Sequence, residues 1–117
     1  ATLDERIVSD RDEVVREIGR ILDGKCADAF ACSNDSIALV ALTELRRRGV
    51  KIPSDLAVVG YDDIEEGRFA DPPLTTIAQD FAAIGFRAAE VVDRAWHEPS
   101  SYRAQFISPR LIRRASV

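Results

Sequence analysis

Apolar residues recur along the chain with helical spacing in three segments, and residue types that start or stop helices bound each segment. The first segment runs from a capping-box spacing at Ser9–Asp12 to Gly24. The same spacing returns over Asp35–Arg48, which Gly49 follows, and again over Asp80–Trp96. The pattern therefore predicts three long helices.

Short apolar runs lie beside and between these helices, and they predict extended strands. The predicted strands are Arg6–Val8, Ala27–Ser33, Leu56–Gly60, Leu74–Ile77 and Tyr102–Ile107. Strands that alternate with helices of about a dozen residues form βαβ units with parallel neighbours. The expected architecture is therefore an α/β fold with a parallel sheet flanked by helices.

Polar side chains follow the first three predicted strands directly. They are Ser9 with Asp10, Asn34 with Asp35, and Asp62 with Asp63. Right-handed crossovers place the carboxyl ends of parallel strands at one edge of the sheet, and ligands of such folds bind outside that edge. The sequence thus predicts a cluster of short polar side chains at a ligand-binding edge.

A purely structural role is an open alternative for some of these residues. Asp10, Asn34 and Asp35 are all types that cap helix N-termini, so capping and ligand contact are about equally supported for each. Asp62 and Asp63 follow an apolar strand with no obvious long helix after them, and capping explains them less well. Ligand contact is the favoured interpretation for this pair.

Other polar positions have simpler explanations. Thr75 and Thr76 fit the preference of threonine for strands. The triplet Arg46–Arg48 fits a solvated surface that complements the dipole at the end of a helix. Gln79 lies at the junction of a strand and a helix, where it is either a neighbour of a cap or a polar lip of the crevice.

Composition and charge exclude several classes of protein. The chain has 117 residues, of which 46% are hydrophobic and 31% charged; this suits one domain, or part of a larger one, and excludes a disordered or collagen-like chain. The longest unbroken apolar run, Ile37–Leu42, is far too short to span a membrane, and no secretory leader opens the chain as given. A net charge of −4 is the wrong sign for a surface that holds duplex DNA by itself.

Catalytic and metal-binding constellations find little support in the sequence. Cys26 and Cys32 suit small buried side chains in a reducing compartment, and with His97 as the single histidine they leave no zinc site. A phosphoryl-accepting site would want a lysine at a later strand end, whereas Lys25 and Lys51 both enter strands at the opposite edge. We therefore expect no metal, no cofactor and no enzymatic activity. The Asn and Asp side chains suit hydrogen bonds to a polyhydroxylated or heterocyclic small molecule.

Four blocks of sequence resemble the LacI/GalR-type bacterial transcription regulators. They are Ala29–Ala38, Arg48–Asp63, Asp71–Phe81 and Pro109–Val117. The blocks occur in the family's order and at its spacing, and together they cover most of the chain. The resemblance implies the C-terminal part of a periplasmic-binding-protein-like (type I) effector domain.

The resemblance also implies a division of the chain and roles for four residues. Residues 1–78 would be part of the C-terminal subdomain, 79–102 a helix of the N-terminal subdomain, and 103–117 a return strand and tail, with the DNA-binding headpiece absent. Asn34 and Asp62 match positions at which the family contacts its effector. Gln79 and Phe81 match positions at the edge of the cleft between the subdomains.

The function implied by the resemblance is that of the effector-sensing portion of a cytoplasmic, dimeric or larger regulator. Its partners would be a small-molecule effector, sugar or nucleobase-like, and operator DNA bound only through the missing headpiece, with no membrane. Ligand-dependent closure of two subdomains would control operator binding. The alternative is a periplasmic sugar-binding protein of a transporter, which shares the fold. The apolar stripe of the helix over Asp80–Trp96 predicts self-association of the chain alone, unless that helix folds back onto the chain's own sheet.

Overall fold

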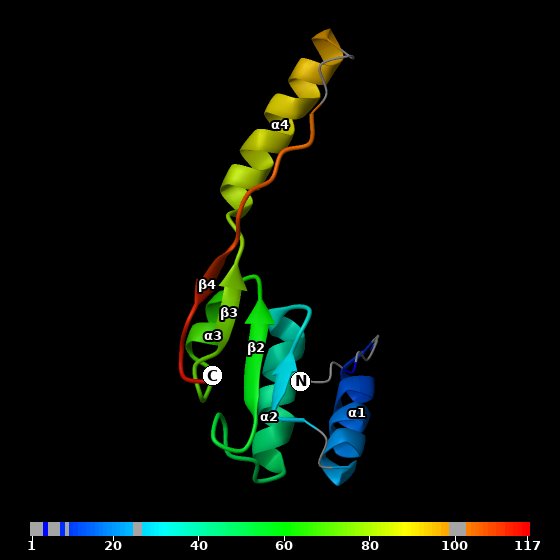
Figure 1. Cartoon of the computed structure of the whole chain (residues 1–117), viewed down its shortest axis with the longest axis vertical. Coiled ribbons are helices and arrows are strands. Elements are labelled where there is room, and N and C mark those ends of the chain that lie inside the picture. Colours follow the sequence, from blue (N-terminus) through cyan, green and yellow to red (C-terminus); the bar gives the residue numbers. More distant parts are fainter. Residues whose placement is uncertain (1–3, 5–7, 9, 25–26, 99–102) are drawn as a thin grey trace.

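A sheet of four strands organises the described part of the chain, which comprises residues 4, 8, 10–24, 27–98 and 103–117 of the computed structural model (Figure 1). The strands are β1 (Ala29–Ala31), β2 (Ala57–Tyr61), β3 (Thr75–Ala78) and β4 (Arg110–Ile112), and they are neighbours in that order. The pairs β1–β2 and β2–β3 are parallel, as predicted, while β4 runs antiparallel to β3. The sheet is therefore mixed rather than wholly parallel.

The predicted position of the last strand is wrong. Residues 103–109 form no strand, and β4 begins only at Arg110, whose register partner is Ala78 at the end of β3. The residues before Arg110 have passed the end of β3, so no neighbour remains for a hydrogen-bonded ladder. Of the predicted first strand, Arg6 and Ile7 lie outside the described residues and Val8 is not in a strand.

The three predicted long helices are present, and a short fourth was not foreseen. They are α1 (Arg11–Gly24), α2 (Asp35–Arg47), the short α3 (Glu65–Arg68) and α4 (Phe81–His97). Each long helix starts at a carboxylate or amide, from Asp10, Asn34 or Asp80, that accepts a hydrogen bond of 2.8 to 2.9 Å from the backbone N–H three residues further on. Such caps contribute about 1 kcal/mol each.

The core lies between the sheet, α2 and α1. α2 packs on β2, and α1 packs on the outer side of α2. The buried apolar residues are Val14, Ile18, Ala38, Ala41, Leu42, Leu45, Leu56, Val58 and Leu74.

The arginine triplet is exposed at the end of α2, as expected, but it also makes specific contacts. Arg47 and Arg48 both bind the nearly buried Glu44, and Arg46 pairs with Asp71 at 2.9 Å.

α4 projects from the end of the sheet, away from α1 and α2 (Figure 1). None of its 17 residues is buried, and residues 103–109 lead back from its far end to β4. The radius of gyration is 18.0 Å, against about 13 Å for a compact chain of this length. We call α4 and residues 103–109 the arm, and the other described residues the body. The alternative in which this helix folds back onto the sheet is not what the structure has.

Candidate functional site

Polar side chains meet at the edge where the three parallel strands end. Asn34 follows β1, Asp62 follows β2 and Gln79 follows β3. The Asp62 Oδ1 atom accepts a hydrogen bond of 2.9 Å from Gln79 Nε2, so two of the predicted site residues are in direct contact. Asn34 lies at the same edge, at the start of α2. Of the predicted cluster, Asn34 and Asp62 lie at this edge, together with Gln79. Ser9 lies outside the described residues, and Asp10 caps α1.

Of the two roles that the sequence left open for Asn34, the structure shows the capping role. Its Oδ1 atom accepts the N–H of Ile37 at 2.9 Å and thereby caps α2. An amide also carries two N–H donors, and Asn34 is half-buried. Its contact with a ligand stays a prediction. Phe81, the fourth predicted residue, is the first residue of α4 and is 58% exposed at the base of the arm.

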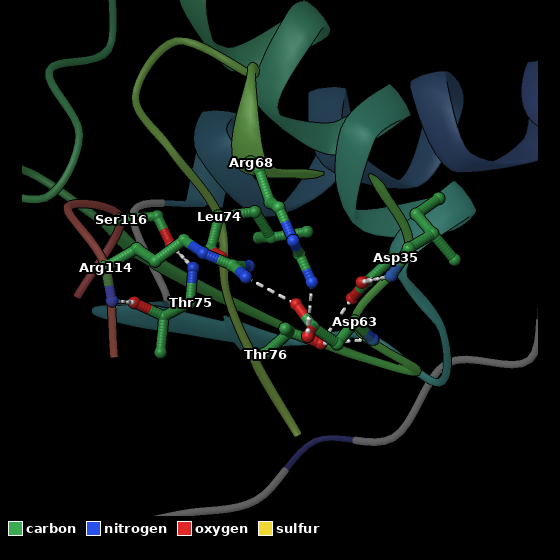
Figure 2. A network of polar contacts seen from close by, with 9 residues as sticks. Asp35, Asp63, Arg68, Leu74, Thr75, Thr76, Arg114 and Ser116 are labelled. Carbon is green, nitrogen blue, oxygen red and sulfur yellow. Dashed lines mark hydrogen bonds and ion pairs between the residues drawn. The ribbon is translucent and has the colours of Figure 1, made fainter. Parts of the chain in front are cut away.

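Asp35 is a structural residue and not a ligand contact, because its side chain is fully buried. Its Oδ1 atom accepts the Thr76 hydroxyl at 2.6 Å, and its Oδ2 atom accepts the N–H of Ile64 at 3.0 Å (Figure 2). Thr76 thus does more than favour a strand. A Cβ atom on Gly60 would stand 2.1 Å from Asp35 Oδ1, so only glycine allows this approach.

The turn at residues 62–64 has an unusual backbone. Its two aspartates have φ angles of 111° and 56°, values that cost roughly 1–3 kcal/mol each for residues other than glycine. All three N–H groups of the turn have acceptors: in chain order, the carbonyl of Ile77 at 2.8 Å, the hydroxyl of Thr76 at 3.4 Å and the carboxylate of Asp35 at 3.0 Å. These bonds hold the backbone in this conformation.

The side chain of Asp63 is engaged by two arginines. Arg114 Nη2 contacts its Oδ1 atom, and Arg68 Nη2 lies 3.3 Å from its Oδ2 atom (Figure 2). Burial alone would raise the pKa of Asp63, but the hydrogen bonds and charges of Arg114 and Arg68 outweigh it and hold the pKa below its usual range. The carboxylate of Asp63 is therefore an ion-pair partner, a role that the sequence did not predict, and contact of Asp62 and Asp63 with a ligand stays a prediction.

The C-terminal tail is fixed to the body by buried hydrogen bonds. Ser116 Oγ accepts the N–H of Thr75 at 2.8 Å and donates to the carbonyl of Val58 at 2.6 Å. The backbone N–H of Arg114 donates to Thr75 Oγ1 at 2.9 Å, and its Nη1 atom donates to the carbonyl of Leu74 at 2.7 Å. Sequence reasoning missed these roles, although Arg114 and Ser116 both lie in the last of the four family-like blocks.

Cys32 and His97 are the cysteine and the histidine among the described residues. Burial, and then the negative charge of Asp35, raise the pKa of the Cys32 thiol to about 11, so the nucleophilic thiolate is scarce at neutral pH. Cys26 and Lys25 lie outside the described residues. His97 is exposed on α4, 3.7 Å from the carboxylate of Asp93. Within the described residues, no three acidic, histidine or cysteine side chains gather as a metal site, and no helix has the length and apolarity to cross a membrane.

Residues 3–117 match the family described as the periplasmic binding protein-like domain. The chain is 38% identical over 96 residues to the HTH-type transcriptional repressor PurR of Actinobacillus pleuropneumoniae, covering 80% of this chain and 29% of that repressor. It is 38% identical over 90 residues to the ribose operon repressor of Haemophilus influenzae, covering 76% and 27%. The chain thus spans less than a third of the length of these curated relatives.

Three solved structures of transcription regulators are similar to this chain in fold. A lac repressor dimer bound to operator and the anti-inducer ONPF matches with a TM-score of 0.80 and 28% identity, over 88% of this chain and 36% of that one. The CelR–cellobiose complex matches with a TM-score of 0.80 and 33% identity, over 92% and 33%. A LacI family regulator from Enterococcus faecium with bound ribose matches with a TM-score of 0.78 and 26% identity, over 92% and 40%. The chain therefore belongs to the periplasmic binding protein-like domain family and, within it, resembles the effector-binding domain of LacI/GalR-type regulators, as its four sequence blocks indicated.

Proposed function

We propose that the chain is the effector-sensing part of a bacterial transcription regulator, and that its ligand binds at the carboxyl ends of β1, β2 and β3. The observation that carries this proposal is the hydrogen bond between Asp62 and Gln79 at that edge, since it brings together polar groups from two separate strand ends. The known repressors among the relatives favour a regulator over a periplasmic sugar-binding protein of a transporter.

The side chains at this edge suit a ligand rich in hydroxyl or N–H groups. The Asp62 carboxylate is a charged acceptor, and Gln79 offers both a donor and an acceptor. Asn34 adds N–H donors, because its oxygen is used in capping α2. Phe81 supplies an exposed apolar face at the base of the arm. A sugar or a nucleobase-like molecule fits this set of groups.

The proposed regulation requires a conformational change, and we expect the arm to take part in it. We expect residues 79–102 to belong with a second subdomain, so that the chain crosses between subdomains near Gln79 and again over residues 103–109. A ligand that binds the closed arrangement more tightly shifts the equilibrium toward closure, and the two crossings are where the hinge motion concentrates. Operator DNA would be bound by a separate headpiece in a cytoplasmic dimer or larger assembly, because this chain carries a net charge of −4.

Calorimetry on the complete gene product tests the site, with ribose, cellobiose and hypoxanthine as probes. Asp62→Ala should weaken the binding of the active probe tenfold to a hundredfold, because a hydrogen bond to a charged group contributes about 1.5–3 kcal/mol. Asp23→Ala is the matched control, since Asp23 is an exposed residue of α1. An affinity that is the same in both variants would overturn the assignment of Asp62.

Gel-shift titration with the gene's own upstream DNA tests the regulator half of the proposal. The complete gene product should bind that DNA, and the active probe should change the affinity. Asp62→Ala should leave DNA binding without probe nearly unchanged and should reduce the response to the probe. Probe binding without any DNA binding would favour the transporter alternative.

A further inference from the structure

Two arginines contact the carboxylate of Asp63, which lies next to the proposed ligand contact Asp62. Arg114 reaches it from the tail and Arg68 from the end of α3 (Figure 2). The side chains of Asp63 and Arg114 are only 14% and 15% exposed, whereas Arg68 is 56% exposed. Water and salt screen a nearly buried pair less than an exposed one, so the contact with Arg114 is the firmer restraint.

Arg114 is itself held in place. Its guanidinium donates to the carbonyl of Leu74 at 2.7 Å, and its backbone N–H donates to Thr75 Oγ1 at 2.9 Å. Ser116, fully buried two residues later, fixes the following part of the tail to β2 and β3. Arg114 therefore connects Asp63 to the buried hydrogen bonds that join the tail to β2 and β3.

The direction of the Asp62 carboxylate depends on this anchor. Asp62 and Asp63 share a peptide in a turn in which both φ angles are positive. A rotation at Asp63 would turn that peptide and swing the Asp62 side chain away from Gln79, its hydrogen-bond partner at 2.9 Å. The N–H of that peptide donates to Thr76 Oγ1 at 3.4 Å, the longest of the three hydrogen bonds of the turn, so the ion pairs of the Asp63 side chain add a second restraint.

We propose that Asp63, held by Arg114 and Arg68, is a positioning residue that aims the Asp62 carboxylate at the ligand, which makes the C-terminal tail part of the recognition machinery. This inference rests on the proposed function, because it takes Asp62 as the group that touches the ligand. The competing explanation is that the Asp63–Arg114 pair only fastens the tail, a task that Ser116 also performs.

The test compares Arg114→Gln with Arg113→Gln in the complete gene product. Arg113 is an exposed neighbour in the same segment, so the pair of variants is matched in chemistry and differs in the contacts of Arg114 with Asp63 and with the carbonyl of Leu74. Asp63→Asn, the double variant Asp63→Asn with Arg114→Gln, and the conservative Arg114→Lys complete the set. Two readouts are taken: affinity for the active probe among ribose, cellobiose and hypoxanthine, and hydrogen exchange of peptides over residues 61–69 and over α2.

Arg114→Gln and Asp63→Asn should each lower the affinity about threefold to tenfold, and the double variant should lose no more than either, since contacting residues act as one unit. Arg114→Lys should restore part of the loss. Exchange over residues 61–69 should quicken, while exchange over α2 stays at the level of Arg113→Gln. A pair that only fastens the tail would leave the affinity of Arg114→Gln for the probe at the level of Arg113→Gln, and this result would overturn the proposal.

Two further results would overturn the positioning role. One is exchange over residues 61–69 that is the same in Arg114→Gln and Arg113→Gln, a readout that needs no ligand. The other is a loss of affinity that accompanies an equal rise in exchange over α2, which marks general destabilisation. Failure of the proposed function looks different: Asp62→Asn would then bind the probe as tightly as the wild type, whatever the exchange pattern shows.

Discussion

The helices α2 and α4 are alike in their sequence pattern and differ in how far they are buried. Both carry an apolar stripe, and both start at a side-chain cap, Asn34 for α2 and Asp80 for α4. Six of the 13 residues of α2 are buried, whereas none of the 17 residues of α4 is. The difference lies in what each helix faces. α2 has β2 on one side and α1 on the other, while α4 extends beyond the sheet.

The comparison shows that an amphipathic pattern predicts that a helix has an apolar face to bury. The surface that buries this face can belong to the same chain or lie outside it. Most of the stability of a helix in a protein comes from packing its apolar face rather than from its intrinsic propensity. The body meets this requirement with its own residues. The arm presents Phe86, Val92 and Trp96, each at least 65% exposed, and the described residues supply no surface that covers them.

The largest expected effect concerns that missing surface. Produced alone, the chain should self-associate through the arm, and Val92→Gln with Trp96→Gln should weaken the association a hundredfold or more. Each buried large apolar side chain contributes about 1.5–3 kcal/mol, and two such losses add up to at least two powers of ten. Light scattering from low to high micromolar concentration measures the change.

Phe69→Gln is the control in the body, because Phe69 is an exposed phenylalanine beside α3 and is 79% exposed. It should leave the association intact. A wild-type chain that stays monomeric at high micromolar concentration, with the amides of α4 protected from exchange, would contradict the prediction.

The second effect compares two glycines. Gly60→Ala should destabilise the body by about 3 kcal/mol or more, because the new Cβ atom would stand 2.1 Å from Asp35 Oδ1 and large losses arise where a buried polar network is broken. Asp35 cannot yield easily, since Thr76 and the N–H of Ile64 hold its carboxylate. Urea unfolding followed by circular dichroism gives the free energy.

Gly85→Ala is the same substitution in the arm, and its expected effect on stability has the opposite sign. A Cβ atom there would meet nothing within 4 Å, so alanine should favour the helix by up to about 1 kcal/mol. The helical signal should rise slightly while the unfolding midpoint of the body stays unchanged. Equal losses of stability in the two variants would show that arm and body unfold as one unit.

The elements that the sequence predicted well are those that local pattern decides. The helix over Asp35–Arg48 and the strand over Leu56–Gly60 agree with α2 and β2 to within a residue or two, since caps and apolar runs mark their ends. The edge cluster followed from topology, because parallel strands must end on one side. That reasoning placed Asp62 at the edge, whereas its contact with Gln79, 17 residues further on, is a finding of the structure.

The errors lie where distant segments decide. The position of β4 depends on contacts of Thr75 with Arg114 and Ser116, 39 and 41 residues further along the chain, which no local pattern reveals. Asn34 and Asp35 are equally good caps by type, and only the packed fold makes one the cap and buries the other. The role of Asp63 likewise required the tail to be in place.

A smaller effect compares the two caps. Asn34→Ala should lower the unfolding free energy of the body by about 1 kcal/mol, because α2 loses the acceptor for its first turn. Asn34→Asp keeps that acceptor and should cost little stability, while both variants should weaken probe binding by removing the N–H donors. Urea unfolding and calorimetry on the same samples separate the two roles.

Asp80→Ala removes the equivalent cap from the arm, where Asp80 Oδ1 accepts the N–H of Ala83 at 2.8 Å. Fraying at the start of α4 should then quicken hydrogen exchange in its first turn and leave the unfolding of the body unchanged. A body destabilised as much by Asp80→Ala as by Asn34→Ala would mean that the arm contributes to the core.

The smallest effect is a dependence of stability on pH that belongs to the body. Hydrogen bonds from Arg47 and then Arg48 lower the pKa of Glu44 from 4.5 to about 2. A carboxyl group with a folded pKa below its unfolded value stabilises the fold fully above the unfolded pKa, and this contribution is lost as the pH falls toward the folded pKa. The urea midpoint of the wild type should therefore fall between pH 4.5 and 2.

Glu44→Gln should flatten that fall, because glutamine has no charge to lose and the two arginines then have no carboxylate in either acid or neutral solution. The matched variant in the arm is Glu90→Gln, which breaks the exposed pair of Glu90 with Arg87 at 2.8 Å. Exposed pairs contribute little to stability, so this variant should keep the wild-type pH profile. Parallel pH profiles for the wild type and Glu44→Gln would show that the arginines of α2 do not stabilise the body through Glu44. The acid sensitivity would then have to come from other carboxylates of the body. Asp63, whose pKa is lowered by Arg114 and Arg68, is the first of these to test.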